Sequence, residues 1–390
     1  MVYRMTEWIE CTLDKLGEIV GGATPSTKCE DYYGGSIPWI TPKDLSSFKG
    51  RYITSGERNI TEKGLASCSA QMMPKDAVLF TSRAPIGYVA IASQSVCTNQ
   101  GFKSIVVNEK ADPLFVYYLL KYNKDAIEAM GSGTTFKEVS GKTMRAVKVR
   151  IPLDVSYQKR IAAVLDSLDT KIENNERIND NLLAQAQTLY KQFFPYGVQD
   201  DLPDGWRIGT VGEIIEIHDS KRIPLSGADR SKMEKKIYPY YGAASLMDLV
   251  DNYIFDGKYL LLGEDGTVVD DAGYPILQYV WGQFWVNNHA HILTGRLGYD
   301  VESLYMLFKQ TPVKSIVTGA VQPKISQANL RSVQVVIPPE HNLREYNDLV
   351  EPLFSLFRAN EEECKTFTAL RDALLPKLMS GEIDVSAVQL

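Results

Sequence analysis

Apolar residues recur at alternating intervals of four and three positions between Tyr157 and Phe194, a stretch without glycine or proline. This heptad pattern predicts one long helix that pairs with another helix along its apolar stripe. The predicted stripe comprises Ile161, Leu165, Leu168, Ile172, Asn175, Asn179, Leu182, Ala186, Leu189 and Phe193. With a rise of 1.5 Å per residue, such a helix is about 55–60 Å long. We expect the sequence FPYG at 194–197 to end it.

A second stripe of the same kind lies near the end of the chain. It comprises Tyr346, Leu349, Leu353, Leu356, Asn360, Phe367, Leu370 and Leu374. We expect the two helices to pack antiparallel, because their lengths match and an asparagine recurs at equivalent positions, Asn174 and Asn360. A buried asparagine lowers stability but defines the register of a helix pair. The alternative, in which each helix lies only on its own domain, stays open at this stage.

Both predicted helices belong to a duplication of the chain. Residues 133–193 align with residues 319–379 at a constant shift of 186 without a gap, so that Gly133 matches Gly319 and Ser140 matches Ser326. Solenoid repeats have periods of about 20–50 residues, so this longer repeat indicates a duplicated domain with its connector. Two similar units in one chain imply two similar tasks.

Short apolar runs between Gly21 and Pro152 predict strands, separated by stretches rich in glycine, proline, serine and threonine. Residues 76–93 predict two strands around an Ala-Pro turn, residues 144–152 a half-buried strand, and residues 113–130 a helix. Each half is therefore expected to be α+β. The expected divisions are 1–155 and 196–340 for the two mixed domains, 156–195 for the first long helix, and 341–390 for the second long helix and a tail.

Composition indicates an ordinary soluble globular protein of 390 residues with a net charge of −6. No run reaches the roughly 18 apolar residues that span a bilayer, and the N-terminal sequence lacks the apolar core of a signal peptide. We therefore expect a cytoplasmic protein. The five cysteines are scattered and form no CxxC motif, so we expect neither a disulfide framework nor a zinc site.

No catalytic constellation recurs in both halves. The string SGKT at 140–143 lacks the first glycine of a phosphate loop, because residue 136 is phenylalanine. The Asn-Pro-Pro-aromatic motif of adenine methyltransferases is missing, and IPPE at 337–340 is the nearest string. An HxH pair and an acidic cluster at 264–271 occur in the second half alone. We therefore expect no catalytic residue, no metal site and no cofactor in this chain.

Polar and basic loops do recur. Residues 99–103 align with 287–291, and residues 133–140 align with 319–326. Their side chains are of the types that read base edges and hold phosphates. The stretch 137–150 carries five basic residues and the single acid Glu138, and such a positive face would reconcile a net charge of −6 with DNA binding. The alternative is that these are ordinary solvated strand and turn residues.

These features define candidate DNA-contacting residues in each half. In the first half they are Lys43, Ser82, Arg83, Asn99, Lys103, Thr134, Thr135 and Lys137. In the second half they are Lys221, Arg222, His289, His291, Gln322 and Lys324. The competing role for Arg83 is structural, in which it ties the Ala84-Pro85 turn to its own sheet.

Seven strings, in this order, carry a family resemblance. They are W-x3-TLDKLGEI from Trp8, DAVLFTSRAPIGYVAI at 76–91, NQGFKSI at 99–105, QKRIAAVLDSLDTKIE at 158–173, LPDGW at 202–206, NNHAHIL at 287–293 and LLPKLMSGEIDV at 374–385. With these strings the chain resembles, over essentially its full length, the specificity (S) subunit of type I restriction-modification systems.

The resemblance implies two mixed α/β target-recognition domains in tandem, separated by two long helices that form an antiparallel coiled coil. It implies a non-catalytic subunit in which each domain reads one half of a bipartite DNA target. It also implies two methyltransferase (M) subunits, which carry S-adenosylmethionine and dock on the helices, and a restriction (R) subunit that can join that core.

The second half departs from the first, because LGEDGTVVD at 262–270 stands where the first half has TSRAPIG. In this family such a difference is expected of domains that read different half-sites. Three other functions remain as alternatives: a free-standing enzyme, a coiled-coil adaptor without DNA contact, and a stand-alone bipartite DNA-binding regulator.

Overall fold

The computed structural model describes residues 7–133, 137–319 and 321–388, and the chain divides into two compact units. Unit 1 combines the chain up to Glu176 with the chain from Glu361 onward, and unit 2 comprises Arg177–Asn360. Two long helices, α6 (Val155–Phe193) and α11 (Glu340–Ser380), each contribute one part to both units. No helix in the described parts of the chain is both long and apolar enough to cross a membrane.

Unit 1 contains a five-stranded sheet, a three-stranded sheet and a two-stranded ribbon. The five-stranded sheet has the order β2 (Gly17–Gly21), β9 (Lys103–Val107), β6 (Val78–Ser82), β7 (Ile86–Ala92), β4 (Tyr52–Ile53). The three-stranded sheet has the order β5 (Asn59–Ile60), β3 (Tyr33–Ile40), β8 (Cys97–Thr98), and β1 (Trp8–Thr12) pairs with β10 (Lys148–Pro152). The two strands expected within 76–93 are confirmed as β6 and β7.

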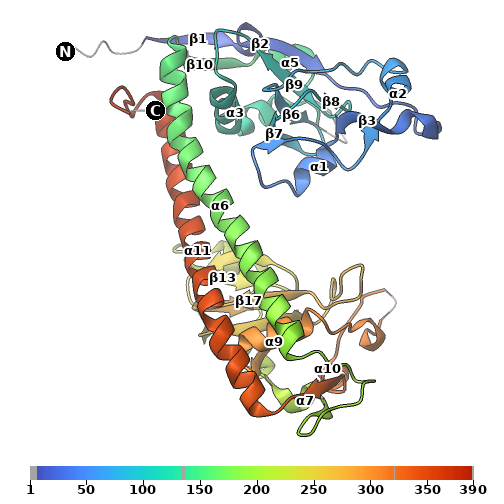
Figure 1. Ribbon diagram of the computed structural model, residues 1–390. Helices are drawn as coiled ribbons and strands as arrows, with labels where there is room; N and C mark the ends of the chain where they lie inside the picture. Colours follow the sequence, from blue (N-terminus) through green and yellow to red (C-terminus); the bar gives the residue numbers. More distant parts are fainter. Residues whose placement is uncertain (1–6, 134–136, 320, 389–390) are drawn as a thin grey trace. The chain divides into compact units, whose positions relative to one another are not determined.

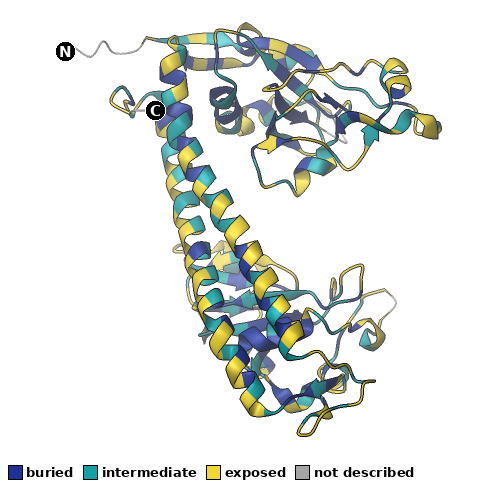
Figure 2. Ribbon diagram, in the orientation of Figure 1, coloured by how far each residue is buried: buried dark blue, intermediate teal, exposed yellow. Residues whose placement is uncertain are grey.

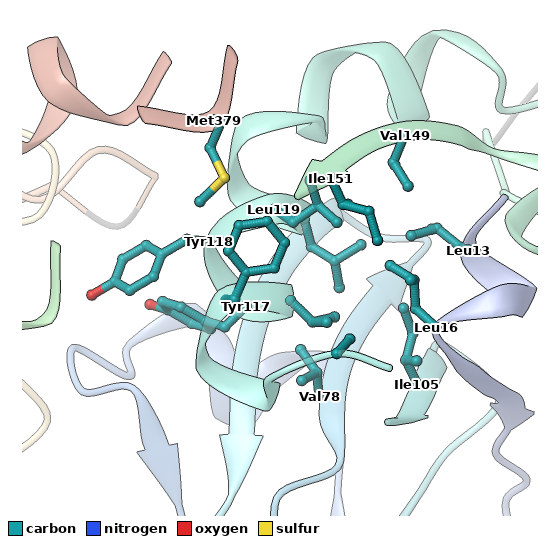
Figure 3. Close-up of a cluster of buried hydrophobic side chains, with 14 of the residues drawn as sticks. Leu13, Leu16, Val78, Ile105, Tyr117, Tyr118, Leu119, Val149, Ile151 and Met379 are labelled. Atoms are coloured by element: carbon teal, nitrogen blue, oxygen red, sulfur yellow. The ribbon is translucent and has the colours of Figure 1, made fainter. Parts of the chain in front are cut away.

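Short helices of unit 1 pack on these sheets: α1 (Pro42–Ser46), α2 (Glu62–Ala66), α3 (Pro113–Tyr122), α4 (Lys124–Ala129) and α5 (Gly141–Ala146). The helix expected over 113–130 is broken at Asn123, whose amide donates to the Leu119 carbonyl. The strand expected over 144–152 begins only at Lys148, because Ser140 caps α5 and residues up to Ala146 are helical. In Figure 3, the buried face of α3 packs with residues of β6, β9 and β10 and with Met379 of α11.

Unit 2 repeats this plan. One sheet has the order β12 (Ile215–Ile217), β19 (Ala290–Gly295), β16 (Tyr259–Gly263), β17 (Leu277–Val280). The other has the order β14 (Leu246–Val250), β13 (Tyr238–Tyr241), β18 (Gln283–Val286), β15 (Phe255–Asp256), and β11 (Arg207–Thr210) pairs with β20 (Gln334–Ile337). The helices are α7 (Val211–Ile214), α8 (Gly227–Ser231), α9 (Val301–Phe308) and α10 (Gln327–Arg331).

The strand orders of the two units correspond. β2-β9-β6-β7 matches β12-β19-β16-β17, and the parallel pair of β3 with β8 matches the parallel pair of β13 with β18. The duplication seen in the sequence is therefore also a duplication of the fold, including the regions where the two sequences differ.

Helices α6 and α11 run antiparallel, side by side in Figure 1. In unit 1 the Asn175 amide donates to Glu363 at 3.0 Å, and in unit 2 the Tyr346 hydroxyl donates to the Ala186 carbonyl at 3.1 Å. Residue numbers thus rise along α6 as they fall along α11, which confirms the expected pairing. The helices also pack on their own domains, since Ile161 and Leu165 belong to the buried core of unit 1.

The expected stripe of α6 is confirmed, and that of α11 needs correction. In α6, Ile161, Leu165, Leu168 and Leu182 are buried, and Ile172, Asn175 and Leu189 are half-buried. In α11, Asn360 is buried and Leu353, Phe367 and Leu374 are half-buried. The prediction is wrong for Leu349, Leu356 and Leu370, which are 52%, 47% and 45% exposed. Figure 2 shows this alternation of buried and exposed positions along both helices.

The physical reason is competition with neighbouring residues. Apolar residues stand side by side at 353–354 and 356–357, so two stripes one residue apart are available on α11. Phe354 and Phe357 form the inward-facing stripe because their rings pack against Tyr279 of unit 2. Beside Leu370, Arg371 turns inward instead, and its guanidinium pairs with the Asp169 carboxylate at 2.7 Å.

Candidate nucleic-acid interface

In unit 1 a loop is closed at the end of β6. Ser132 and Glu138 exchange backbone hydrogen bonds of 3.0 and 2.9 Å, and the Val139 N–H donates to the Ser82 carbonyl at 3.0 Å. The Glu138 carboxylate pairs with the Arg83 guanidinium at 3.4 Å and with the Lys103 ammonium at 3.6 Å. Backbone bonds and ion pairs therefore hold the two ends of this loop against the sheet.

Ser82, Arg83, Lys103 and Lys137 lie at or beside this loop base. Arg83 and Lys103 are partly buried and face Glu138, and the Asn99 side-chain carbonyl accepts from the Gly101 N–H at 2.8 Å. Lys137 is exposed, whereas Thr134 and Thr135 lie outside the described residues. Lys43 lies apart on α1, exposed and paired with Glu57 at 2.7 Å.

Ser82 requires a correction. Its side chain is 0% exposed, and its hydroxyl donates to the Gly101 carbonyl at 3.1 Å. A hydroxyl enclosed in the sheet does not reach DNA, so the expectation that Ser82 faces DNA is wrong. Its role in this structure is to join β6 to the turn before β9.

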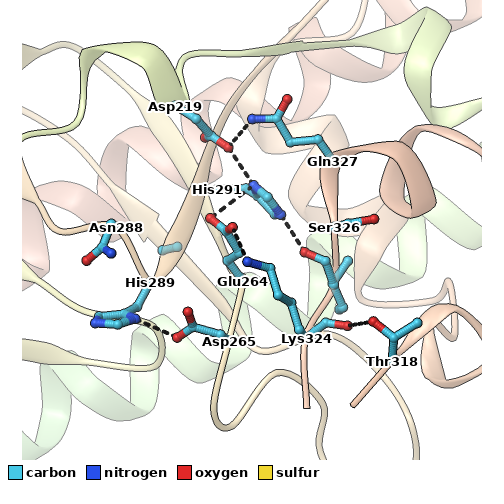
Figure 4. Close-up of polar contacts among 12 residues, drawn as sticks. Asp219, Glu264, Asp265, Asn288, His289, His291, Thr318, Lys324, Ser326 and Gln327 are labelled. Carbon is cyan, nitrogen blue, oxygen red and sulfur yellow. Dashed lines mark hydrogen bonds and ion pairs between the residues drawn. The ribbon is translucent and has the colours of Figure 1, made fainter. Parts of the chain in front are cut away.

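Unit 2 closes a loop at the equivalent place (Figure 4). Thr318 and Lys324 exchange backbone hydrogen bonds of 2.9 and 2.7 Å, and the Ile325 N–H donates to the Glu264 carbonyl at 2.8 Å. Glu264 thus takes the place of Ser82 in unit 1, and Lys324 takes the place of Glu138. The backbone scheme is the same in both units, while the side chains change charge.

Ion pairs surround the base of this second loop. The Lys324 ammonium lies 3.2 Å from one oxygen of Glu264, and the Arg222 guanidinium lies 2.5 Å from the other. Burial alone would raise the pKa of Glu264, but the hydrogen bond from Arg222 and the charges of His291 and Arg222 hold it below its ordinary value. Glu264 is therefore an ionised carboxylate between two cations.

His291 is the most deeply buried member of this group, with 0% exposure. Its Nδ1 lies 2.6 Å from the Asp219 carboxylate, and its Nε2 lies 2.8 Å from the Ile325 carbonyl oxygen. The expectation that His291 faces DNA is therefore wrong, because strands and the loop enclose the ring. His289, two residues earlier, is 44% exposed at the side chain and pairs with Asp265 at 2.5 Å.

The remaining candidates of unit 2 differ in accessibility. Lys221 and Gln322 are exposed, and Val321 beside Gln322 is 99% exposed. Arg222 points inward, since its Nη1 also donates to the Ala290 carbonyl at 2.8 Å. Lys324 is half exposed at its side chain, so its ammonium serves the ion pair with Glu264 and still borders solvent.

Asp219, Glu264 and His291 offer three ligand atoms within 4.8 Å of one another, a geometry that could hold a metal ion. Arg222 lies 3.3 Å from Asp219 and 2.5 Å from Glu264, so a metal ion would have to displace a guanidinium that already neutralises both carboxylates. The arrangement fits a buried ion network better than a cation site.

Sequence reasoning did not select some exposed basic residues. Lys232 and Lys235 are exposed in the segment between β12 and β13, where the string KMEKK at 232–236 was a usable signal. Arg145 and Arg331, equivalent in the repeat, are both exposed in the last turns of α5 and α10. The repeat alignment itself marks this second pair as a recurring feature.

The fold defines a class: two copies of one α+β domain, each with a polar loop anchored at a sheet end, combined with an antiparallel helix pair. A family model described as type I restriction modification DNA specificity domain matches residues 5–184 and 203–363. The chain belongs to this family.

The chain is similar to named specificity subunits and to a solved structure. The specificity subunit of the type I restriction enzyme MjaIX of Methanocaldococcus jannaschii is 31% identical, over 97% of this chain and 94% of the relative. The specificity subunit of EcoR124I/EcoR124II of Escherichia coli is 28% identical over 47% of this chain and 46% of the relative. The crystal structure of a type I restriction-modification S subunit from M. genitalium matches in fold with a TM-score of 0.61 at 17% identity, over 97% of both chains.

Proposed function

We propose that this chain is the DNA sequence-specificity subunit of a type I restriction-modification complex, and that each unit carries a domain that reads one half of a bipartite target. The observation that carries the proposal is the tandem match to a DNA specificity domain, which covers both units. The equivalent loops at the sheet ends support it, because each presents polar side chains from a rigid base.

The two domains read different half-sites. Around the loop base, unit 1 has the acid Glu138 on the loop and two bases at the sheet end, while unit 2 has the base Lys324 on the loop and the acid Glu264 at the sheet end. Different side chains on the same backbone scheme offer different donors and acceptors to base edges, and sequence is read through such groups.

The helix pair docks two M subunits. Leucines are exposed on it within each unit, Leu349 and Leu356 in unit 2 and Leu370 in unit 1. Exposed leucines of this kind are side chains that a bound partner would cover. The M subunits hold S-adenosylmethionine and methylate adenine, R subunits can join that core, and this chain supplies no catalytic group or cofactor of its own. The free cysteines fit a cytoplasmic setting.

The deciding experiment is genome-wide detection of methyladenine in cells that carry this chain with its M subunit, compared with cells lacking the chain. We expect one bipartite motif with two defined half-sites and a constant spacer. Methylation that is unchanged by deleting the chain would contradict the proposal.

Purification separates the remaining alternatives. We expect the chain to co-purify with M at a ratio of one to two, and to bind a duplex carrying the mapped motif. Duplex binding that needs no M subunit would favour a stand-alone regulator, and binding to M without any DNA binding would favour an adaptor.

A further inference from the structure

The proposed function leaves His291 unexplained, because a residue with 0% exposure does not touch DNA. It lies on β19 and connects two segments distant in sequence. One is the 3-10 turn Asp219–Lys221, through Asp219, and the other is the loop that ends at Ile325. Each nitrogen of a buried polar ring needs a hydrogen-bond partner, and both nitrogens of His291 have one.

Both ring nitrogens face acceptors. The Ile325 carbonyl oxygen can only accept, so Nε2 carries a hydrogen. The Asp219 carboxylate also accepts from the Gln327 amide at 2.6 Å and from the Ile292 N–H at 3.0 Å. Burial alone would raise the pKa of Asp219, but the hydrogen bonds with His291 and from the Ile292 N–H hold it below its ordinary value. Each ring nitrogen of His291 therefore has an oxygen partner of its own.

The bond to Ile325 has a direct consequence for the loop. Ile325 follows Lys324, which closes the loop with Thr318, and precedes Ser326, which caps α10 by accepting from the Asn329 N–H. Both backbone groups of Ile325 are engaged, its N–H by Glu264 and its carbonyl by His291. One end of the loop is thus held in a single position.

The loop presents reading groups beyond this base. Val321 is 99% exposed and Gln322 is exposed. A glutamine amide is of the type that pairs with adenine in the major groove, and a small apolar side chain is of the type that contacts a thymine methyl. Such contacts require placement within about 0.5 Å, so they depend on what anchors the loop.

Unit 1 performs the equivalent anchoring differently. There Lys103, which the repeat alignment places opposite His291, contacts the loop acid Glu138 at 3.6 Å. A nitrogen-bearing side chain stands at both positions, but in unit 2 the acid that it contacts lies on the 3-10 turn and not on the loop.

We propose that His291 is a positioning residue that determines half-site specificity in unit 2, by holding the Ile325 end of the loop against Asp219. The inference rests on the proposed function and identifies what sets the geometry of one reading element. It predicts that disturbing His291 alters recognition of one half-site and leaves the other half-site and the spacer unchanged.

The test is methyladenine mapping with the assembled complex carrying His291→Leu or His291→Lys. Leucine removes both hydrogen-bonding nitrogens, so sites mismatched in the second half-site should gain methylation about tenfold relative to the matched site, the discrimination of one bidentate base contact. Lysine again places a hydrogen-bond donor there, as at Lys103, and should recover most of the discrimination. Lys103→Leu is the matched control and should affect the first half-site alone.

Thermal unfolding of each variant separates loss of fold from loss of position. Gln327→Leu gives a second route, because Gln327 is exposed on α10 and its replacement removes a single donor from Asp219. It should relax the second half-site in the same direction, by a smaller factor, even if His291→Leu fails to fold.

Three outcomes decide the matter. Relaxed recognition of the second half-site alone supports the inference. Unchanged recognition in a folded His291→Leu complex overturns it. If His291→Leu does not fold, unchanged recognition in Gln327→Leu overturns it. A folded His291→Lys variant that does not recover the discrimination of the second half-site also overturns it. A wild-type complex that methylates no bipartite motif would refute the proposed function itself, a result distinct from both.

Discussion

Arg83 has two competing roles, contact with DNA or attachment of the loop base, and its contact with Glu138 at 3.4 Å favours attachment. We expect Arg83→Glu alone to weaken DNA binding, because it places two acids side by side and adds negative charge near phosphates. The double variant Arg83→Glu, Glu138→Lys restores an opposite pair without changing net charge. It should recover most of the affinity in a binding titration.

The size of this recovery is informative. Partly exposed ion pairs contribute about 0.2–1 kcal/mol, so a recovery of up to several-fold in affinity is expected. A double variant that binds as weakly as Arg83→Glu would show that Arg83 itself contacts DNA.

Asn179 and Asn360 form a polar contact inside the apolar stripe of unit 2. The Asn360 amide donates to the Asn179 side-chain carbonyl at 2.9 Å, and both residues are buried. Asn360→Leu removes that donor from a buried acceptor and should lower the free energy of unfolding by about 1–3 kcal/mol. Replacing both by leucine should regain that loss, since two apolar groups then meet. Urea denaturation measures both, and a fully stable single variant would contradict the assigned pairing.

At the scale of elements, α11 shows which of its two possible stripes packs inward. Phe354 is 1% exposed and belongs to the core of unit 2, while Leu356 two positions on is 47% exposed. We expect Phe354→Ala to lower the free energy of unfolding by about 3–5 kcal/mol. Leu356→Ala should change it by no more than about 0.5 kcal/mol. Equal effects in a denaturation series would mean that the stripe is assigned wrongly.

Leu356 also tests the proposed docking of M subunits on the helix pair. Leu356→Asp should leave the unfolding temperature of the isolated chain unchanged and reduce co-purification with M, because a charge then enters an apolar contact. Ser355→Asp is the matched control, since it adds the same charge at the neighbouring exposed position without removing an apolar side chain. Full retention of M by Leu356→Asp would exclude this leucine from the docking surface.

At the scale of the whole molecule, α6 passes from unit 1 to unit 2 between Glu176 and Arg177, and α11 passes back between Asn360 and Glu361. A seven-residue insertion at both points retains every contact inside each unit and nearly preserves the helix phase. It adds about 10 Å of helix, or roughly three base pairs. We expect methylation mapping to show a longer spacer and unchanged half-sites.

An insertion in α6 alone is the control. It brings the two helices out of register, so we expect lower stability and loss of methylation. Altered half-sites with an unchanged spacer in the paired insertion would refute the idea that the helices set the spacing.

Local patterns were sufficient for the elements that repeat. The heptad intervals of 157–194 depend only on helix geometry, and they predicted α6 and its buried positions. The constant shift between the two halves predicted two copies of one fold, and the strand orders agree. These properties follow from the sequence alone because periodicity and similarity are read along the chain, without knowledge of distant partners.

Tertiary structure alone decided the environment of individual polar groups. Ser82 and His291 were candidate DNA-contacting residues, yet both are fully buried, because strands and loops distant in sequence enclose them. The inward-facing stripe of α11 likewise depends on tertiary contacts, because Phe354 packs on Tyr279 and Arg371 pairs with Asp169. A side chain's type and spacing determine what it can bind, but the fold determines which partner is within hydrogen-bond distance.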